Sequence, residues 1–523
     1  MATRLPAARR GTPRALPRHV TSPVLVGRRS ELIWLGEALA RVSDNGRAAM
    51  LIGGGAGVGK SRLVGEFTAT AAAHARVLRG RCPELGPVGL PFAPFTDVLR
   101  TLVGEFGADG VGALLSSEQA GPGGCELIRL LPELGEPVPG GSPREARARL
   151  FVEMLSLLET LACRRPVVLV IEDAHWADES TRDLLSFLID NQRAMERVLI
   201  IVTFRSDELH RGHPLPSLLG RLGRLDWVQR IELSGLDRGE SAELIAHIMA
   251  GDPAAGLVDR VFGRTAGNPL CVEQLVCCDR EPAVTPRDLM LAGVQRLPEP
   301  TQDVLRTASV GGQRAGRALL CAVTGLTPAE LGETLRPAVD AGVIIAAEGT
   351  YGFRHALISE ALHQDLLPGE HTAMHQQFAV ALEADPSLVP PGRAAIELAQ
   401  HWYHAHDPAR SLAGAWQAAA AAGRTLACAE QLAMLTRVLE LWHSVPGAEW
   451  LTGTGHAQVL AQAAVAATAA GESQLGESLA AAARRESNAD LDCDPVRSRP
   501  NAQRTRCRRG WLTTKPRAAL AAE

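Results

Sequence analysis

A glycine-rich segment at residues 54–61, GGAGVGKS, matches the spacing G-x-x-x-x-G-K-[ST]. It follows a short apolar run and opens a helical pattern, so it lies at a strand-to-helix turn. Glycines at such a turn let backbone N–H groups point at a phosphate, and the helix N-terminus favours negative charge. The lysine would reach the β- and γ-phosphates, and the serine would ligate Mg²⁺. The predicted nucleotide contacts are Gly54, Gly55, Ala56, Gly57, Val58, Gly59, Lys60 and Ser61.

The scarcity of lysine makes this match more informative. Basic residues number 54, yet the sequence contains lysine only as Lys60 and Lys515. A chance occurrence of the pattern in a glycine-rich chain therefore becomes improbable. Together with the strand before it and the helix after it, the motif predicts binding of ATP or ADP with Mg²⁺.

Two acidic residues end a second apolar run, VVLVIED at residues 167–173. Beside a phosphate-binding loop, an acid at the end of a neighbouring strand holds the magnesium shell, and another can polarise the attacking water. Glu172 and Asp173 are therefore the predicted catalytic acids, and with Ser61 they are the predicted Mg²⁺ ligands. Their spacing leaves open which acid takes which role, and two acids that merely cap a strand are the alternative.

A third candidate is Arg205, which follows the apolar run RVLIIVTF at residues 197–204. Sites in parallel sheets lie at the carboxyl ends of the strands. Arg205 is therefore predicted to face the γ-phosphate as a catalytic residue, and an exposed loop arginine is the alternative.

These candidates need a sheet to bring them together, and the first half of the chain predicts one. Apolar runs alternate with helical patterns, which is typical of a parallel, right-handed α/β sheet. The strands are expected at residues 48–54, 76–82, 167–173, 197–204 and 227–236. Residues 83–145 are rich in glycine and proline, and we interpret them as an insertion rather than a separate domain.

The pattern becomes helical after Gly251, with a helix pair at residues 260–276 that is interrupted at Gly267, Asn268 and Pro269. A wing-like β-hairpin is expected around Gly349. Two alanine-rich stretches resemble helical hairpins with the tetratricopeptide period of about 34 residues, although an ordinary helical bundle fits equally well. The predicted organisation is a disordered leader (1–23), a P-loop ATPase domain (24–250), a helical lid (251–284), a winged-helix-like domain (285–368), a helical TPR-like region (369–490) and a basic disordered tail (491–523).

Composition excludes several other classes of protein. The 523 residues carry a formal net charge of −4, which excludes a bulk polycation held on nucleic acid by charge alone. The sequence contains no apolar run of about 18 residues, so it predicts no membrane span. The Arg- and Pro-rich start lacks the apolar core of a secretory signal. An Arg-rich transit peptide is the alternative to a disordered leader. The ten cysteines are scattered without a CxxC pair, which fits buried thiols in a reducing cytoplasm.

Four segments together resemble a known group: GGGAGVGKSRLV, VLVIEDAHWADEST, TFRSDE and GRTAGNPLCVEQL. They look like a STAND-class, AAA-type ATPase, and more closely like the large ATP-binding regulators of the LuxR family from actinobacteria. The resemblance covers roughly residues 24–490. It implies an α/β P-loop NTPase with a parallel sheet, followed by a helical lid, a winged helix and an α-helical, TPR-like region.

The resemblance also implies further nucleotide contacts. LVGRRSEL looks like the family's entry motif near the adenine, which would involve Val26, Gly27 and Arg28. GNPL looks like the GxP motif, so Pro269 would pack on the nucleotide. FRHALISEALHQDLLPGE looks like the winged-helix segment, in which His355 would sense the diphosphate; a surface or core histidine is the alternative. Gly55 stands where the family often carries glutamate, which the loop should tolerate.

The functional prediction is a cytoplasmic, signal-responsive ATPase of slow turnover that acts as part of a LuxR-family transcriptional regulator. ADP would hold the nucleotide domain closed on the winged helix. An unknown small-molecule or protein inducer on the helical region, together with ATP, would release this domain so that the chain self-associates. The family's C-terminal helix-turn-helix is not recognised, so we expect no sequence-specific DNA binding by this chain alone, and the recognition face of the internal winged helix is expected to be buried. The alternatives are a truncated nucleotide-binding interaction protein without significant turnover, and the ATPase module of another signalling protein.

Overall fold

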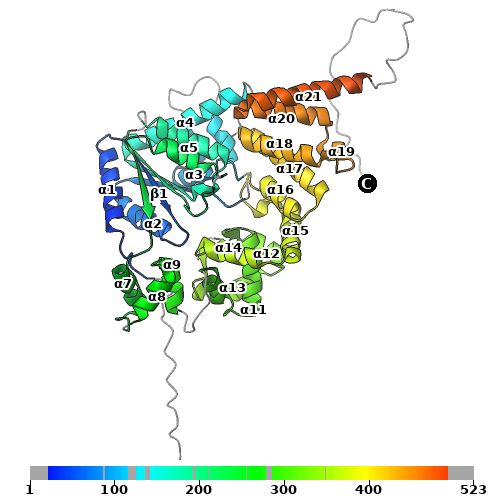
Figure 1. The fold of residues 1–523 in the computed structure, drawn as a ribbon. Helices are drawn as coiled ribbons and strands as arrows, with labels where there is room; N and C mark the ends of the chain where they lie inside the picture. The colour runs from blue at the N-terminus through cyan, green and yellow to red at the C-terminus, as the bar shows by residue number, and fades with distance from the viewer. Residues whose placement is uncertain are drawn as a thin grey trace, which may run out of the picture.

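The structure is a computed structural model that describes residues 22–85, 89–115, 125–135, 142–192, 196–210, 212–254, 256–277, 286–347 and 349–492. The predicted disordered leader and tail lie outside these ranges, except for two residues of each. The described elements follow one another as an α/β domain, a helical lid, a winged-helix domain and a helical array (Figure 1).

The sheet has five strands, all parallel, in the order β2-β3-β4-β1-β5. The predicted strands and the predicted α/β fold are confirmed. The three inner strands are buried at every residue, as expected for apolar runs covered on both faces. Their bounds are β1 (Ala48–Gly54), β2 (Arg76–Arg81), β3 (Val167–Glu172), β4 (Val198–Thr203) and β5 (Val228–Leu233).

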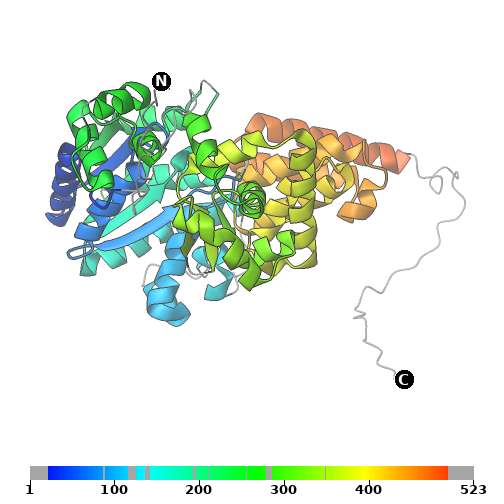
Figure 2. The ribbon, with the colours of Figure 1, turned by 90° about the horizontal axis from the view of Figure 1, so that it is seen from below.

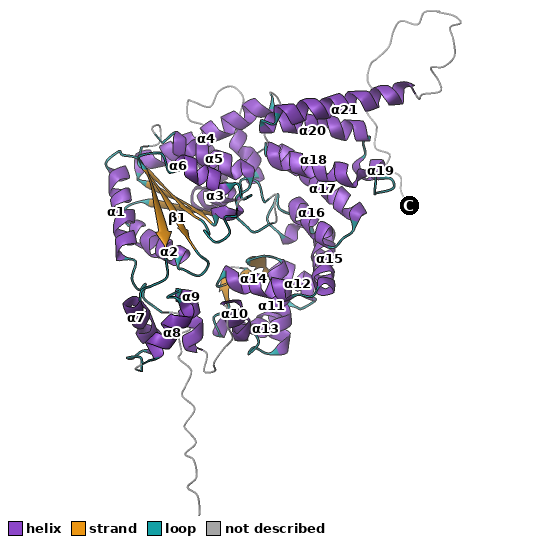
Figure 3. Ribbon diagram, viewed as in Figure 1, coloured by secondary structure: helices purple, strands orange, loops and turns teal. Residues whose placement is uncertain are grey.

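Helices cover both faces of this sheet (Figure 3). The first face packs against α1 (Arg29–Ser43) and α2 (Lys60–Ala71), where Leu35 and Leu63 are fully buried. The helices of the other face are α3 (Ala93–Leu115), α4 (Pro143–Arg164), α5 (Glu179–Asp190) and α6 (Leu215–Leu222), with the short 3₁₀ helices η1 (Glu126–Leu130), η2 (Pro132–Leu134) and η3 (Ala174–Trp176). Because α3 contacts β2 and shares one core with α4, the segment predicted as an insertion belongs to this domain.

The lid consists of α7 (Arg238–Met249), α8 (Leu257–Thr265) and α9 (Pro269–Cys277). Asp237 caps α7 in a capping box with Glu240, which explains why the helix begins there. The predicted break at Gly267 is present: its φ is +72°, and a Cβ would stand 1.8 Å from the carbonyl oxygen of Leu236. Only glycine fits this close approach of two backbones.

The winged-helix domain contains α10 (Pro286–Val294), α11 (Glu299–Val310), α12 (Arg317–Thr324), α13 (Pro328–Asp340) and α14 (Ala356–Asp365). Its antiparallel sheet contains β6 (Arg314–Gly316), β7 (Ile344–Ala347) and β8 (Thr350–Phe353), in the order β6-β8-β7. The predicted hairpin around Gly349 is confirmed, since β7 and β8 pair on either side of it.

The prediction that the recognition face of the winged helix is buried is wrong. The helix before the hairpin, α13, packs through Leu331, Leu335 and Ala338, while Glu333 and Arg336 on its other side are exposed. The domain meets the ATPase domain through Glu360 on α14 and through Gln313 beside β6, so these contacts do not use the outer face of α13.

The helical array runs from α15 to α21 and returns to the ATPase domain (Figures 1 and 2). The predicted alanine-rich hairpins are present as the pairs α17–α18 and α20–α21. At the return contact, the carboxylate of Glu430 on α18 accepts hydrogen bonds from the backbone N–H and the hydroxyl of Ser180, at 3.0 and 2.6 Å. The array comprises α15 (Pro368–Ala384), η4 (Pro386–Leu388), α16 (Ala394–His404), α17 (Pro408–Arg424), α18 (Cys428–Trp442), α19 (Ala448–Thr452), α20 (His456–Ala470) and α21 (Ser473–Asp492).

Two sequence expectations concern the molecule as a whole. Within the described ranges, no helix has the length and apolar character that crossing a membrane requires. The cysteines whose side chains the structure describes carry free thiols. The prediction that they are buried is confirmed for Cys82, Cys271 and Cys428 and is wrong for Cys163, which is exposed; Cys125 and Cys321 are half-buried.

Candidate functional site

The glycine-rich loop lies at the carboxyl end of β1 and leads directly into α2, as its motif predicts. Gly57 and Gly59 have φ values of +75° and +100°, which side chains with a Cβ rarely adopt. A Cβ at Gly55 or Gly59 would meet no other atom within 4 Å, so open space borders the loop there. The backbone conformation therefore fits a loop that curls around a phosphate.

Lys60 is the first residue of α2, and its side chain folds back under the loop. Its Nζ donates hydrogen bonds to the carbonyl oxygens of Gly54 (2.7 Å) and Gly55 (2.9 Å). An ammonium group has three donors, and these two bonds within the described residues leave the third for a phosphate oxygen. Burial lowers the pKa of Lys60 to about 8, against the opposing effect of Asp173. Burial of the charged ammonium group is unfavourable, and an anion at the loop would offset this penalty. The site therefore fits a nucleotide phosphate.

The two predicted acids lie together at the end of β3 and are held by an arginine that the sequence analysis did not single out. Arg81 is the last residue of β2, and the parallel register places it opposite Glu172. Its guanidinium lies 2.9 Å from a carboxylate oxygen of Glu172 and 3.5 Å from one of Asp173. Although burial opposes its charge, the two carboxylates raise the pKa of Arg81. The register of adjacent parallel strands is the signal that would have revealed this residue.

The two acids differ in their surroundings. Asp173 has a left-handed backbone (φ +58°), and its N–H donates to the hydroxyl oxygen of Thr203 on β4 at 3.1 Å. Burial raises the pKa of Asp173, while Arg81 and Lys60 lower it. Glu172 faces Arg81 and, at 3.8 Å, Arg79. Asp173 is therefore the acid that interacts electrostatically with the lysine of the loop.

The carboxylates and the hydroxyl of Ser61 are the oxygen donors that Mg²⁺ prefers. Ser61 is exposed, one residue into α2, whereas Glu172 is buried and Asp173 is half-buried. The donor set therefore fits the predicted magnesium ion, and it would be held by residues from α2 and the end of β3.

Arg205 lies just beyond β4 and is buried, which excludes the alternative of an exposed loop arginine. It pairs with the carboxylates of Glu208 (2.6 Å) and Asp207 (3.4 Å), and with Glu360 on α14 of the winged-helix domain. Asp207 in turn accepts a hydrogen bond from the N–H of Ala56 in the loop, at 3.3 Å. Arg205 therefore connects the nucleotide-binding loop to the winged helix through its ion pairs.

The predicted entry segment, residues 26–28, contacts both the lid and the glycine-rich loop. Val26 is buried against the lid, and a Cβ at Gly27 would collide with the carboxylate of Glu240. Arg28 donates to the carbonyl oxygens of Val58, at 3.2 Å, and of Ser234 beyond β5. These contacts place the three predicted entry residues beside the loop.

The lid reaches the loop through Asn268 rather than through the predicted Pro269 alone. Asn268 donates from its amide to the carbonyl oxygen of Ala56 at 2.8 Å, and its own oxygen caps α9 by accepting from Leu270 and Cys271. Pro269 occupies the first helical turn, where its missing N–H costs nothing. The pattern Asn-Pro at a helix start is the signal that would have indicated this capping role.

His355 stands apart from these residues. It precedes α14, and burial lowers its pKa to about 4. Within the described part of the chain, its buried Nε2 has no hydrogen-bond partner, and no hydrogen bond or ion pair joins it to the loop. Its predicted role as a diphosphate sensor stays a prediction.

Comparisons with known proteins give one family match and one curated relative. Residues 24–201 match the family model of the AAA ATPase domain. An uncharacterized protein of Rhizobium meliloti (strain 1021) is 25% identical over 416 residues; the alignment covers 70% of this chain but 37% of that protein's length.

Two solved structures are similar at lower identity. A signal transduction ATPase with numerous domains (STAND) from Pyrococcus horikoshii, which has a tetratricopeptide repeat sensor, is 15% identical with a TM-score of 0.47, over 90% of this chain and 66% of that one. The Walker-type ATPase of Pyrococcus abyssi is also 15% identical, with a TM-score of 0.34, over 65% of this chain and 96% of that one.

The matched segment begins before the entry residues and contains the glycine-rich loop, Lys60 and both acids. It ends within β4, just before Arg205. The segment of this chain that matches the AAA ATPase domain is therefore the segment that contains most of the predicted site.

Proposed function

We propose that the chain is a STAND-type ATPase that hydrolyses ATP slowly and uses the bound nucleotide as a switch. The observation that carries this proposal is the position of Arg205, which is buried at the nucleotide site and ion-paired with Glu360 of the winged helix. A cation that faces the γ-phosphate in one state and a winged-helix carboxylate in another would couple the nucleotide to the domain arrangement.

Each residue of the site has a defined task in this proposal. The loop N–H groups and Lys60 bind and orient the phosphates, and the N-terminus of α2 adds a favourable dipole. Bound Mg²⁺ would neutralise charge on the phosphate oxygens. Asp173, which interacts with Lys60, would lie on the magnesium side, and Glu172 would orient the attacking water once Arg81 releases it.

The regulatory role is the finer part of the proposal. The motif resemblance supports a module of a large ATP-binding LuxR-family transcriptional regulator, in which ADP keeps the winged helix docked and ATP permits self-association. In this proposal, the arrangement in which Glu360 on α14 pairs with Arg205 and α18 contacts α5 represents the closed state.

A cavity of about 760 Å³ supplies a place for the proposed inducer. Its walls come from the ATPase domain, the winged helix and the helical array. Arg81 lines it and donates a hydrogen bond to Gln313 of the winged helix at 3.2 Å, while its other nitrogens hold the two acids. A small molecule with an anionic group would compete for Arg81 and so reach the catalytic acids directly. Six arginines line the cavity against three acids: Arg81, Arg100, Arg129, Arg314, Arg393 and Arg424, with Glu84, Asp97 and Glu397.

The test measures turnover and assembly together. Purified chain is incubated with ADP, ATP or a slowly hydrolysed ATP analogue plus Mg²⁺, and phosphate release and light scattering are recorded. We expect slow phosphate release, a smaller species with ADP and a larger one with the analogue. Phosphate release no faster than from the Lys60→Ala variant, with nucleotide still bound by the wild type, would favour the alternative of a nucleotide-binding interaction protein.

A further inference from the structure

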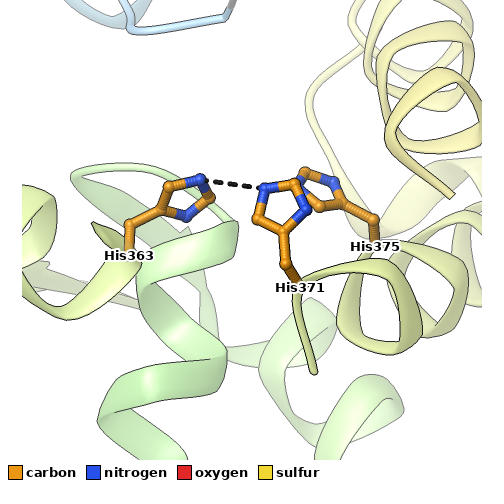
Figure 4. A group of neighbouring side chains, drawn as sticks. All are labelled: His363, His371 and His375. Carbon is orange, nitrogen blue, oxygen red and sulfur yellow. Dashed lines mark hydrogen bonds between the residues drawn. The ribbon is translucent and has the colours of Figure 1, made fainter. Parts of the chain in front are cut away.

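A cluster of histidines lies where the winged-helix domain joins the helical array. His363 is in the last turn of α14, His371 and His375 lie one turn apart on α15, and His401 and His404 belong to α16. Figure 4 shows the first three rings turned toward one another from the two helices. One ring nitrogen from each of these three lies within 4.8 Å of the others.

The spacing of these nitrogens matches a coordination site. The Nε2 atoms of His363 and His371 are 3.2 Å apart, the pair joined by the dashed line in Figure 4. Two imidazole ligands on a tetrahedral ion, each with a bond of about 2.0–2.1 Å, have nitrogens about 3.3 Å apart. His375 lies i,i+4 from His371, so both rings leave the same face of α15. A small rotation of the His375 ring would complete a three-histidine set.

The second nitrogen of His375 already has a partner of the kind that orients a ligand. Its Nδ1 lies 2.8 Å from Nδ1 of His401, so one of the two rings donates to the other. Its Nε2 is buried and has no hydrogen-bond partner among the described residues. Ligating histidines generally fix their other nitrogen by such a contact. The unpartnered Nε2 is therefore the atom that an ion would use.

The surroundings favour neutral rings with free lone pairs. Burial lowers the pKa of His363, of His371 and of His375, and the neighbouring histidines add to the effect. The ring of His404 lies 4.7 Å from that of His375 and 5.4 Å from that of His371, centroid to centroid. Because Nε2 of His404 already lies 2.7 Å from the amide nitrogen of Gln400, the fourth position is assigned to water. Imidazole-only sites select Zn²⁺, Co²⁺, Ni²⁺ or Cu²⁺ over Mg²⁺ and Ca²⁺.

We propose that His363, His371 and His375 bind one divalent transition-metal ion, with Zn²⁺ as the expected occupant. The ion would fasten α14 to α15 across the two-residue turn between them. Because Glu360 on the same α14 holds Arg205, the ion would also fix the winged-helix side of the nucleotide site. The metal site itself stands on the histidines and does not depend on ATP hydrolysis.

The test uses the full chain after chelator treatment and dialysis. Zn²⁺ is titrated against a chromophoric chelator, and Co²⁺ binding is followed by the visible bands of a tetrahedral site. We expect one ion per chain, and at least about tenfold weaker binding for His363→Gln and for His371→Gln. The matched control is His456→Gln, whose ring pairs with Glu486 at the far end of the array, and it should bind as the wild type does.

Two outcomes would overturn the site. The first is an absence of tetrahedral Co²⁺ bands together with Zn²⁺ binding no tighter than in the His371→Gln variant. The second is equal affinity in both cluster variants and the control, which would make the histidines packing residues. Circular dichroism of each variant checks that it folds; if a variant fails to fold, the wild-type stoichiometry and Co²⁺ spectrum decide the question alone.

Discussion

The nucleotide site of the ATPase domain and the contact that the winged-helix domain makes with it are encoded in the sequence in different ways. In the ATPase domain, consecutive residues at the ends of buried strands form the site, so a loop of eight residues and an adjacent pair of acids contain most of its chemistry. The winged-helix domain reaches the site with two side chains: Glu360, which lies more than 150 residues beyond its partner Arg205, and Gln313, which accepts a hydrogen bond from Arg81.

The difference teaches where chemistry can be recognised in a sequence. A loop that binds phosphate through its backbone needs glycines at fixed positions, because residues with a Cβ rarely adopt the positive φ angles found at Gly57 and Gly59. A single ion pair across a domain boundary imposes no local pattern. We expect the motif residues to determine the affinity for the nucleotide. We expect the winged helix to determine how slowly the nucleotide dissociates.

The largest effect is expected for Lys60→Ala. The variant loses the cation that faces the phosphates, and one charge-assisted hydrogen bond of about 2 kcal/mol corresponds to roughly 30-fold weaker ATP binding. Isothermal titration with ATP and Mg²⁺ measures the change. Arg62→Ala is the control, since Arg62 lies two residues on in α2 and donates to the carbonyl oxygen of Ser22. Unchanged affinity in folded Lys60→Ala protein would contradict the phosphate-binding loop.

Glu172→Gln and Asp173→Asn should lower turnover more than binding. Loss of a group that orients water or magnesium costs about 100-fold in rate, while Lys60 and the loop still hold the nucleotide. Steady-state phosphate release and ATP affinity are compared for each variant. Asp190→Asn, at the end of α5 and paired with Arg221, serves as the control. If both variants hydrolyse ATP like the wild type, the acids only cap their strand.

A smaller, kinetic effect is expected for Glu360→Gln. The variant removes the winged-helix partner of Arg205 but leaves Asp207 and Glu208, so the docked state is weakened without disrupting the loop. We expect ADP to leave several-fold faster, measured by stopped-flow with a fluorescent ADP analogue. Glu333→Gln on the exposed side of α13 is the matched control. Equal release rates in both variants would show that the winged helix does not retain the nucleotide.

The sequence predicted the ATPase domain in more detail than the contacts between domains. All five strands, the loop at the end of β1 and the acids at the end of β3 follow from apolar runs and a motif. Arg81 was missed because its partner Glu172 lies 91 residues away on the neighbouring strand. The capping role of Asn268 was missed because Asn-Pro was interpreted only as a helix break.

The histidine cluster was missed in part for the same physical reason. His371 and His375 have the i,i+4 spacing that places two ligands on one face of a helix, and the sequence analysis did not use this signal. His363 joins them only because α14 and α15 pack with their rings together, which no spacing along the chain encodes. The burial of α13 was predicted wrongly because the resemblance implied a clamp without indicating which helix of the domain supplies it.

We expect ATP binding to be accompanied by a modest uptake of protons by Lys60. Burial lowers the pKa of Lys60 to about 8, below its ordinary value, so the free site is partly deprotonated near that pH. Phosphate oxygens favour the charged form and raise this pKa again. ATP binding at pH 8 should therefore take up about half a proton, falling toward zero near pH 6. Titrations in buffers of different ionisation enthalpy measure the uptake, and Lys60→Ala should abolish it.

The smallest effect is expected for DNA, where the winged helix is the element to test. Its helix α13 exposes Glu330, Glu333 and Asp340 beside Arg336, so the face that a winged helix would offer to a groove is mainly acidic. Specific recognition needs side chains that reach base edges and cations that contact phosphate. We therefore predict no sequence-specific binding by this chain.

The basic stretch at residues 497–517 has eight basic residues and no acid, so weak binding that ignores sequence is expected at low salt. Each neutralised phosphate steepens the salt dependence by about 0.9 on a log–log plot. Fluorescence anisotropy with unrelated duplexes at two salt concentrations separates non-specific from sequence-specific binding, because non-specific binding disappears at moderate salt. A footprint on one defined site that survives moderate salt would contradict the prediction. If Glu333→Gln then altered that footprint, α13 rather than the basic stretch would be the reader, and the winged helix would serve both nucleotide and DNA.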